Sequence, residues 1–348
     1  MKTNIVIGAG FAGAVIANLL ATLKNEKVLV IDRKTHVAGN YYDYRDKNGI
    51  MVQKFGSHVF HTSNDRVWNY LKHFTDFNQY MHKVTAVIDG QEVTVPFNLN
   101  TLHDLLPKTI AQKTEEKLIE NFGFNKKVSL EELAKKEDVD LAFLTNYLKE
   151  KSAIKEIFVG KDNRYYQDKY QGIPLDGYTA VVERMLMHPN IELRLGIDFR
   201  EVTAKFDRIF YTGAIDEYFN YEFGQLPYTS AIFKLEEHDR EFYQTNAVIE
   251  YPENYDFSKI HEYKHYLNDK STKTVIAKEY IVNFEPTRTE RTYPVVTKES
   301  SKLYNKYLEK ANAQGNVYFL GTLGNFKPLE LDEIIANSIE VFENINKK

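Results

Sequence analysis

The sequence predicts an α/β protein, and three observations support this class. An apolar run begins at Asn4, a glycine-rich turn follows it, and an apolar helix pattern continues over about Ala12 to Leu23. A second apolar run, Lys27 to Ile31, ends at Asp32. Strand, helix and strand in this order are typical of a βαβ unit. Alternating β-branched and aromatic runs further along the chain predict strands outside that unit.

The turn carries the glycine pattern of a Rossmann dinucleotide-binding unit. Gly8, Gly10 and Gly13 have the GxGxxG spacing, and Asp32 follows at the end of the second strand. Gly8 permits a tight turn, Gly10 lets the backbone approach a pyrophosphate, and Gly13 lets the helix pack on the strand. The helix N-terminus favours phosphate, and Asp32 would accept hydrogen bonds from an adenosine ribose. We therefore expect a bound dinucleotide rather than a glycine turn without a ligand.

A helical insert is expected between Asn100 and about Phe158. Within it, Thr101 to Asn121 is rich in Leu, Lys and Glu, which favour helices. Ser129 and Glu132 have the spacing of a capping box and precede an amphipathic stretch.

A sheet beyond the Rossmann unit is suggested by strand-like alternation. It covers about Tyr80 to Val95 and Tyr228 to Val295, including Thr274 to Ile281, and we group Asn316 to Leu320 with these runs.

The nucleotide domain is expected to be discontinuous. The run Arg208 to Gly213 resembles a later strand of that domain, and a final helix, Leu331 to Asn344, is expected to pack back on it. We assign 1–78, 178–222 and 312–348 to the nucleotide domain, 100–160 to the helical insert, and 79–99, 161–177 and 223–311 to the sheet domain.

Composition excludes several classes of function. The chain has 348 residues, with 45 basic and 49 acidic side chains and a formal net charge of -4. No strong positive field is therefore available to hold nucleic acid or an anionic bilayer. The absence of cysteine excludes disulfides, thiolate metal sites and a cysteine nucleophile. The apolar run Ile5 to Ala17 contains three glycines and is too short to span a membrane. We expect no secretion signal, no membrane insertion and a cytoplasmic location.

The segment His261 to His265 matches the HExxH spacing of zinc hydrolases. Two histidines at i and i+4 bind zinc on a helix, with a third ligand from elsewhere. The surrounding residues favour a strand, in which Ile260, Glu262, Lys264 and Tyr266 would face away from the two histidines. We therefore expect no metal site. GxSxG and P-loop patterns are also missing from the sequence.

The segment Lys54 to Thr62 holds two histidines, His58 and His61, in a setting of small residues. They could line a redox cofactor, or they could be hydrogen-bonded structural histidines. The segment alone leaves both interpretations open.

The chain resembles UDP-galactopyranose mutases in motifs spread over nearly its whole length. They are GAGFAG (8–13), VLVIDR (28–33), AGN (38–40), KFGSHVFHT (54–62), PFNLNT (96–101), DNRYYQDKYQGIPLDGYT (162–179), RIFYTGAIDEYF (208–219), HEYKH (261–265), KEY (278–280) and GTLG (321–324). The resemblance implies a Rossmann-type FAD domain, a helical bundle and a twisted antiparallel sheet, with the active site in the cleft between them.

The resemblance also implies a reaction. Such enzymes convert a nucleotide-sugar pyranose into its furanose form, here most directly UDP-galactopyranose into UDP-galactofuranose. FAD would act in its reduced form, FADH-, whose N5 attacks the anomeric carbon. The implied partners are a UDP- or dTDP-hexose and NAD(P)H or another reductant, and a homodimer is left open.

Matched position by position, the resemblance assigns His61 and His58 to catalysis beside the flavin. The cofactor-binding residues that it implies are Gly8, Gly10, Phe11, Ala12, Gly13, Asp32, Arg33, Asn40, Gly56, Ser57, His58, Gly213, Gly321 and Leu323. The substrate-binding residues that it implies are Phe97, Asn98, Tyr147, Arg164, Tyr165, Tyr170, Lys259 and Tyr293. It implies no metal.

The departures from the family pattern fall on the substrate side. The family usually has two arginines that grip the diphosphate; here 157–161 has no arginine, and Lys259 stands at the second place. The family's loop tryptophan has no counterpart, because the only tryptophan is Trp68. The replacement cations are Lys155, Lys161, Arg164, Lys259, Arg288 and Arg291. Among them, we expect Lys155, Arg288 and Arg291 to be solvated surface charges.

Three alternatives stay open from sequence. The same chemistry could act on dTDP-fucopyranose, UDP-N-acetylgalactosamine or UDP-arabinopyranose. The chain could instead be a conventional flavin oxidoreductase, because a fold does not determine a function. It could also be a non-catalytic flavin-binding paralogue.

Overall fold

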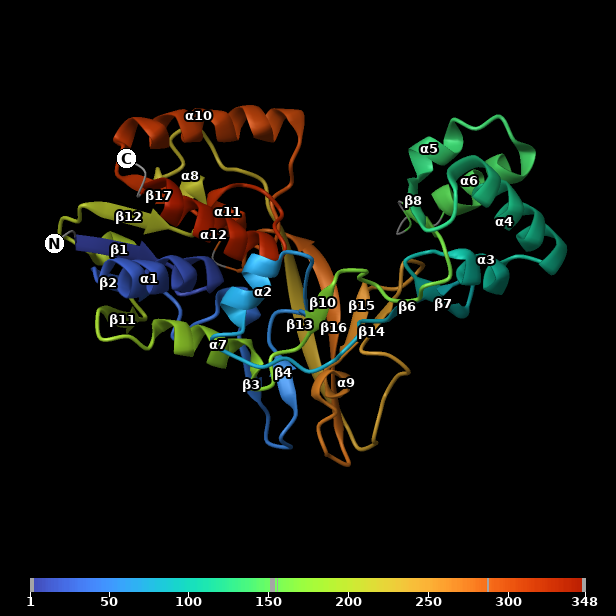
Figure 1. The fold of residues 1–348 in the computed structure, drawn as a ribbon, viewed down its shortest axis with the longest axis horizontal. Helices are drawn as coiled ribbons and strands as arrows, with labels where there is room; N and C mark the ends of the chain where they lie inside the picture. The colour runs from blue at the N-terminus through green and yellow to red at the C-terminus, as the bar shows by residue number, and fades with distance from the viewer. Residues whose placement is uncertain (1–2, 151–153, 155, 287, 346–348) are drawn as a thin grey trace.

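Five parallel strands form the sheet at the N-terminal side of the molecule (Figure 1). The structure is a computed structural model that describes residues 3–150, 154, 156–286 and 288–345. In spatial order the strands are β11 (Ile191–Leu195), β2 (Lys27–Asp32), β1 (Thr3–Ile7), β12 (Arg208–Tyr211) and β17 (Val317–Phe319). Every neighbouring pair is parallel, which confirms the predicted Rossmann-type unit.

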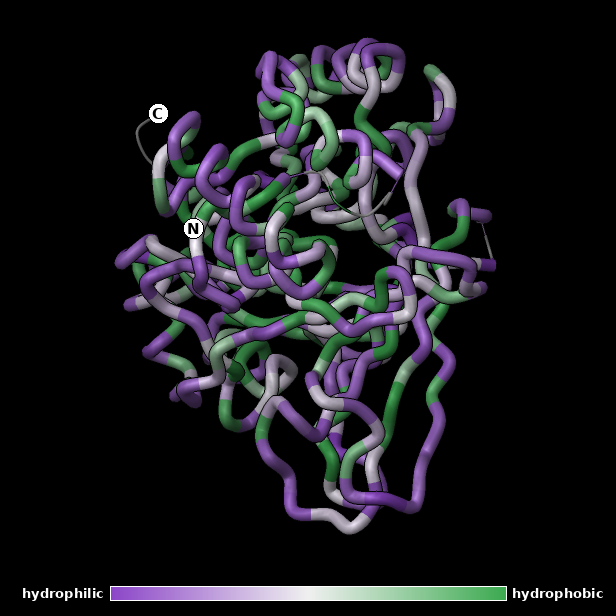
Figure 2. The backbone as a smooth tube through the Cα atoms, turned by 90° about the vertical axis from the view of Figure 1, so that its right-hand side faces the viewer, coloured by the Kyte–Doolittle hydropathy of each residue, from purple (hydrophilic) through white to green (hydrophobic). Residues whose placement is uncertain are grey.

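Helices cover this sheet because its side chains alternate between two apolar faces. Phe210 and Tyr318 pack toward one hydrophobic cluster, with ring centroids 5.1 Å apart, whereas Phe319 packs toward another. The first cluster is formed by α1 (Phe11–Lys24), α7 (Gly177–Leu186) and α12 (Leu331–Ile345). The second lies under α8 (Ile215–Tyr218) and α10 (Lys298–Gln314). Figure 2 shows hydrophobic stretches in the interior and hydrophilic ones on the outer turns.

A second sheet of six strands stands between the Rossmann unit and the helical insert (Figure 1). Its spatial order is β13 (Thr229–His238), β16 (Thr274–Asn283), β15 (Lys259–Glu262), β14 (Val248–Glu250), β6 (Val84–Ile88) and β7 (Gln91–Val95). All pairs are antiparallel except β14 with β6, which run parallel, so the sheet is mixed.

The insert has its own hydrophobic cluster and extends to one side (Figure 1). Its helices are α3 (Leu99–Leu105), α4 (Lys108–Phe122), α5 (Leu130–Ala134) and α6 (Val139–Glu150). The predicted capping box is confirmed, because the Glu132 N–H donates to Ser129 Oγ at 3.2 Å and the Ser129 N–H to Glu132 Oε2 at 2.9 Å. An antiparallel pair, β8 (Lys126–Ser129) with β9 (Glu156–Val159), was not predicted.

Short elements connect these parts. They are η1 (Gly39–Tyr41), β3 (Asp43–Arg45), β4 (Met51–Gln53), β5 (Phe60–Thr62), α2 (Asp65–Leu71), β10 (Tyr170–Gly172), η2 (Phe199–Glu201), α9 (Lys264–Leu267) and α11 (Gly321–Gly324).

Three sequence expectations are corrected. Residues 317–319 join the Rossmann sheet, because β17 pairs with β12; this agrees with the assignment of 312–348 to the nucleotide domain and corrects the grouping of Asn316 to Leu320 with the outer strands. Residues 298–311, assigned to the sheet domain, form most of α10, which packs on α8 and β17. The HEYKH segment is a strand only to Glu262 and continues into α9. Among the described residues, every helix is too short or too polar to cross a bilayer.

Candidate functional site

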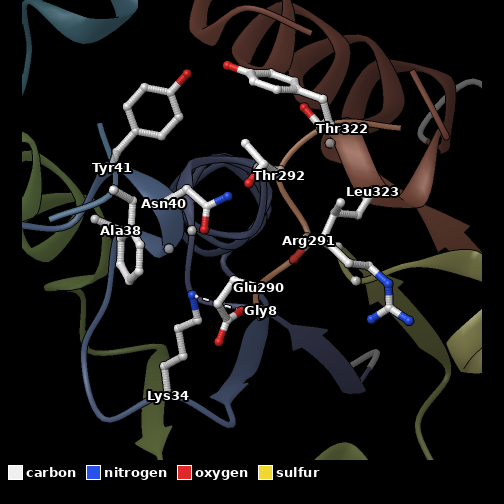
Figure 3. Close-up of a pocket in the computed structure, with 18 of the residues that line it drawn as sticks. Gly8, Lys34, Ala38, Asn40, Tyr41, Glu290, Arg291, Thr292, Thr322 and Leu323 are labelled. Atoms are coloured by element: carbon white, nitrogen blue, oxygen red, sulfur yellow. Dashed lines mark ion pairs between the residues drawn. The ribbon is translucent and has the colours of Figure 1, made fainter. Parts of the chain in front are cut away.

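A cavity of about 400 Å³ runs from the carboxyl ends of β1 and β2 to the second sheet. Ligands of open α/β sheets bind at the carboxyl ends of the strands. Figure 3 shows Asn40 and Tyr41 on one side of the cavity and Thr322 and Leu323 on the other, with Gly8 beside Glu290.

The glycine turn shapes one end of this cavity. Gly8 has φ +111°, and a Cβ there would lie 1.9 Å from Thr212 Oγ1. A Cβ on Gly13 would lie 1.9 Å from the carbonyl oxygen of Gly8, so only glycine permits this contact between α1 and β1. Gly10 differs: a Cβ there would meet only the backbone of Gly39, at 3.9 Å, among the described residues within 4 Å. Gly10 and Gly39 thus leave a cradle at the N-terminus of α1, which suits a pyrophosphate.

Asp32 is oriented beside the cradle. Its Oδ2 accepts a hydrogen bond from the Ala9 N–H at 2.8 Å, and its Oδ1 accepts one from the Lys34 N–H at 2.8 Å. Each carboxylate oxygen has a further lone pair for a ribose hydroxyl. The cradle and the oriented carboxylate together fit the adenosine diphosphate half of FAD.

Charged residues border the same end of the cavity. Lys34 and Arg33 pair with Glu290 at 3.5 and 3.8 Å, and Figure 3 shows the Lys34–Glu290 pair beside Gly8. Arg291 pairs with Glu217 at 2.8 Å, and its side chain is only 5% exposed. The expectation that Arg291 is a solvated surface charge is therefore wrong.

The other end of the cavity is bordered by Gly56, Ser57 and His58 and by residues of the second sheet. Nε2 of His58 lies 3.0 Å from the carbonyl oxygen of Asn40 and donates to it. Burial lowers the pKa of His58 to about 4. Burial and the nearby charge of Lys259 lower the pKa of His82, which lies behind the site, to about 3.

These two histidines predict sensitivity to acid. In the unfolded chain both histidines would titrate near pH 6.5, so protonation favours the unfolded chain below that pH. The free energy of unfolding is therefore highest above pH 6.5 and falls as the pH drops toward the folded-state pKa values of about 4 and about 3. Each histidine should lower the free energy of unfolding by about 2 kcal/mol at pH 5 relative to pH 7.5. Urea unfolding at the two pH values, with saturating FAD, measures the effect. His82→Phe should remove about half of it, and an equal pH dependence in this variant would contradict the assignment.

Most of the predicted cofactor residues lie around this one cavity. Thirteen of the fourteen border the cavity. Gly13 is the exception, because it packs against Gly8 and Val6. Of the eight predicted substrate residues, Lys259 and Tyr293 border the cavity.

The other substrate candidates lie elsewhere in the described part of the chain. Phe97 is buried in the core of the insert, and Asn98 caps α3 by accepting from the Asn100 and Thr101 N–H groups. The Tyr147 hydroxyl donates to Asp89 at 2.7 Å.

The remaining three candidates form contacts around β10. Arg164 pairs with Asp162 at 2.6 Å. Tyr165 packs edge-on against Tyr166. Tyr170 stacks on Trp68 with centroids 4.5 Å apart.

His61 lies on β5, beside the cavity rather than in its lining. Its Nδ1 lies 2.8 Å from Asp168 Oδ2, and its ring stacks on Tyr166 at 3.5 Å. Its Nε2 lies 4.0 Å from Glu330. The Asp168 carboxylate accepts a hydrogen bond from Nδ1–H and so orients the ring, and Nε2 lies on the side of Glu330.

Most of the other candidate cations are paired. Lys259 lies 2.8 Å from Glu250; burial lowers its pKa, but Glu250 outweighs burial and raises it, so the ammonium stays charged. Lys161 pairs with Glu115 at 3.0 Å. Arg288 is 79% exposed, as expected. Lys155 lies outside the described residues.

Sequence reasoning missed several lining residues as site residues. Glu279, Glu290, Thr292 and Lys34 border the cavity. Of these four residues, only Lys34 could have been identified from its neighbours in sequence, because it directly follows Arg33. Within the described ranges, no group of three or more His, Cys, Asp and Glu residues is arranged to hold a metal ion.

The fold and the cradle define a Rossmann-type dinucleotide-binding protein, and residues 6–74 match the profile of an NAD(P)-binding Rossmann-like domain. Residues 134–328 match the profile of UDP-galactopyranose mutase. The chain belongs to the UDP-galactopyranose mutase family, whose members are FAD-dependent isomerases.

Relatives support this over the full length. The chain is 34% identical to a dTDP-fucopyranose mutase of Escherichia coli, covering 98% of this chain and 97% of the relative. It is 31% identical to a probable UDP-galactopyranose mutase of Klebsiella pneumoniae, covering 97% and 93%. A crystal structure of reduced UDP-galactopyranose mutase matches with a TM-score of 0.75 at 13% identity, covering 100% of this chain and 96% of that one. The last match supports the fold.

Proposed function

We propose that this enzyme converts a nucleotide-sugar pyranose into its furanose form with reduced FAD. One observation carries the proposal: a single cavity joins the glycine cradle to Lys259 on the second sheet and to Tyr293, whose carbonyl accepts from the Thr229 N–H at the edge of that sheet. When bound, reduced flavin would supply a nucleophile for the anomeric carbon, and the reaction would cause no net change in its oxidation state. The protein then needs only to position the sugar and retain the departing diphosphate.

The chain's own residues divide these tasks. Gly10, Gly39 and Asp32 hold the nucleotide half of the cofactor. Lys259, charged and cavity-facing, attracts the diphosphate of the substrate. Tyr293 offers an exposed ring and hydroxyl at the same end. His61, oriented by Asp168, can hold or accept a proton at Nε2.

Two substrates have support. UDP-galactopyranose is the first candidate, from the family profile and the 31% identical relative. dTDP-fucopyranose is the second, from the 34% identical relative. Replacement of the family's gripping arginines by Lys259 gives a point charge in place of a planar fork, and this fits either diphosphate.

The test is to incubate dithionite-reduced enzyme with a panel of nucleotide pyranoses and to detect furanose products. Furanose from UDP-galactose or dTDP-fucose supports the proposal and selects the substrate. Net oxidation of a substrate would make the chain an oxidoreductase. Failure of every sugar both to react and to perturb the reduced-flavin spectrum would make it a non-catalytic paralogue.

His61 predicts a separation of turnover from cofactor retention. His61→Ala should lower kcat by roughly 100-fold or more, the usual worth of a positioned acid or base. Its FAD content should stay at the wild-type level, because His61 lies beside the cavity rather than in its lining. Asp168→Asn, which keeps the shape but loses the charge, should have an intermediate kcat. Wild-type turnover in His61→Ala would remove His61 from the mechanism.

A further inference from the structure

Two histidines of the HEYKH segment have different surroundings. His261 and Lys259 share one face of β15, because side chains alternate along a strand. Glu279 of β16 is opposite Lys259 in register, so it lies on this face too. All three residues border the cavity. Glu262 faces the other way and is fully buried.

On the cavity face, a hydrogen-bonded chain links three side chains. His261 Nδ1 lies 2.7 Å from Ser57 Oγ, and its Nε2 lies 2.7 Å from Glu279 Oε2. The side chain of His261 is only 4% exposed, and that of Glu279 is 13% exposed. Ser57 borders the cavity and follows Gly56, whose φ of +112° turns the backbone there. The hydrogen-bonded order is therefore serine, imidazole and carboxylate.

The carboxylate sets the direction of the chain. Burial raises the pKa of Glu279, but the hydrogen bond that its carboxylate accepts from His261 outweighs burial and helps to hold the pKa below its usual value. An ionised carboxylate only accepts hydrogen bonds, so an imidazole ring with a single proton carries that proton on Nε2. Nδ1 then accepts the Ser57 hydroxyl proton. The Ser57 oxygen is left with its lone pairs for the cavity.

We propose that Ser57, His261 and Glu279 form a positioning relay that fixes the Ser57 oxygen as a hydrogen-bond acceptor for an N–H group of the bound flavin ring. The inference rests on the proposed function, because it places the flavin ring at the end of the cavity opposite the cradle. A Ser57 oxygen that accepts no hydrogen bond is unfavourable in a site from which bound flavin would exclude most of the water. Reduced flavin carries an N–H donor that oxidised flavin lacks. The relay therefore stabilises the reduced cofactor, the form that the mutase reaction uses.

The chain contains a matched control. His265 Nε2 lies 3.1 Å from Glu262 Oε2, so it is also a histidine paired with a glutamate. This second pair lies away from the cavity, and Glu262 is held by the N–H groups of Tyr243 and Gln244. A general loss of a His–Glu pair can thus be separated from loss of the relay.

The test is the midpoint potential of bound FAD, measured by spectroelectrochemical titration of the holoenzyme. Ser57→Ala and His261→Gln should weaken binding of reduced relative to oxidised FAD by about tenfold, which lowers the potential by about 30 mV for a two-electron couple. Ser57→Thr keeps the hydroxyl and should keep the wild-type potential, as should His265→Gln. An unchanged or higher potential in Ser57→Ala would overturn the relay.

The two hypotheses fail separately. If wild-type holoenzyme forms no furanose but Ser57→Ala still lowers the potential, the proposed reaction fails and the relay stands. If furanose forms and the potential of Ser57→Ala equals that of the wild type, the relay fails and the reaction stands. Should Ser57→Ala misfold, the comparison of His261→Gln with His265→Gln decides the matter in the same way.

Discussion

Gly10→Leu is expected to abolish FAD retention while leaving the fold intact. Gly10 has φ -81° and ψ -175°, which any residue can adopt. A Cβ there would meet only the Gly39 backbone among the described residues within 4 Å, so we expect the leucine side chain to extend into the cradle rather than disturb the core. Loss of two hydrogen bonds to the charged pyrophosphate would cost about 3 to 6 kcal/mol, or roughly 10² to 10⁴ in affinity.

Fluorescence titration with FAD measures this loss, and far-UV circular dichroism with thermal unfolding checks the fold. Gly13→Ala is the contrasting variant, since its Cβ would lie 1.9 Å from a backbone oxygen and should lower Tm. Wild-type FAD affinity in Gly10→Leu would show that the cofactor does not pass through the cradle.

Lys259→Met is expected to weaken nucleotide-sugar binding to the reduced enzyme by about 10- to 150-fold. A hydrogen bond to a charged group contributes about 1.5 to 3 kcal/mol, and Lys259 is the cavity-facing cation of β15. Methionine keeps much of the length and volume of the side chain. Because the change also leaves Glu250 unpaired, the double variant with Glu250→Gln separates loss of attraction from added repulsion.

Lys278→Met is the matched control. Lys278 is opposite Ile260 in register and so lies on the other face of the sheet, paired with Glu236 at 2.9 Å. The Lys278→Met variant should bind UDP-galactose and dTDP-fucose with wild-type affinity. Lys259→Arg, which keeps a positive charge at the site, should recover most of the binding that Lys259→Met loses. If Lys259→Met and the double variant both bind normally, another cation holds the diphosphate.

Local patterns predicted the nucleotide half of the site. The glycine spacing, the helix after it and Asp32 lie within one βαβ unit, so their geometry follows from a short stretch of chain. The same holds for the capping box at Ser129, which is complete within four residues. The resemblance extended this to Asn40, Ser57 and Leu323, all of which border the cavity.

Long-range contacts decided what sequence could not predict. Arg291 resembles any exposed arginine along the chain, and its burial depends on Glu217, 74 residues away. Glu279 becomes part of the cavity only through the register of β15 with β16. A strand of three residues such as β17 carries too little pattern to show which sheet it joins. Asn98, in a recognisable motif, turned out to be a helix cap.

The central claim is that flavin takes part in the reaction and returns unchanged, and a single-reduction experiment tests it most directly. The holoenzyme is reduced once with dithionite, freed of excess reductant under anaerobic conditions, and given a large excess of UDP-galactopyranose or dTDP-fucopyranose. We predict many furanose molecules per flavin while the flavin spectrum stays reduced. Product limited to one equivalent with reoxidation of the flavin, or equal rates with oxidised enzyme, would contradict the account.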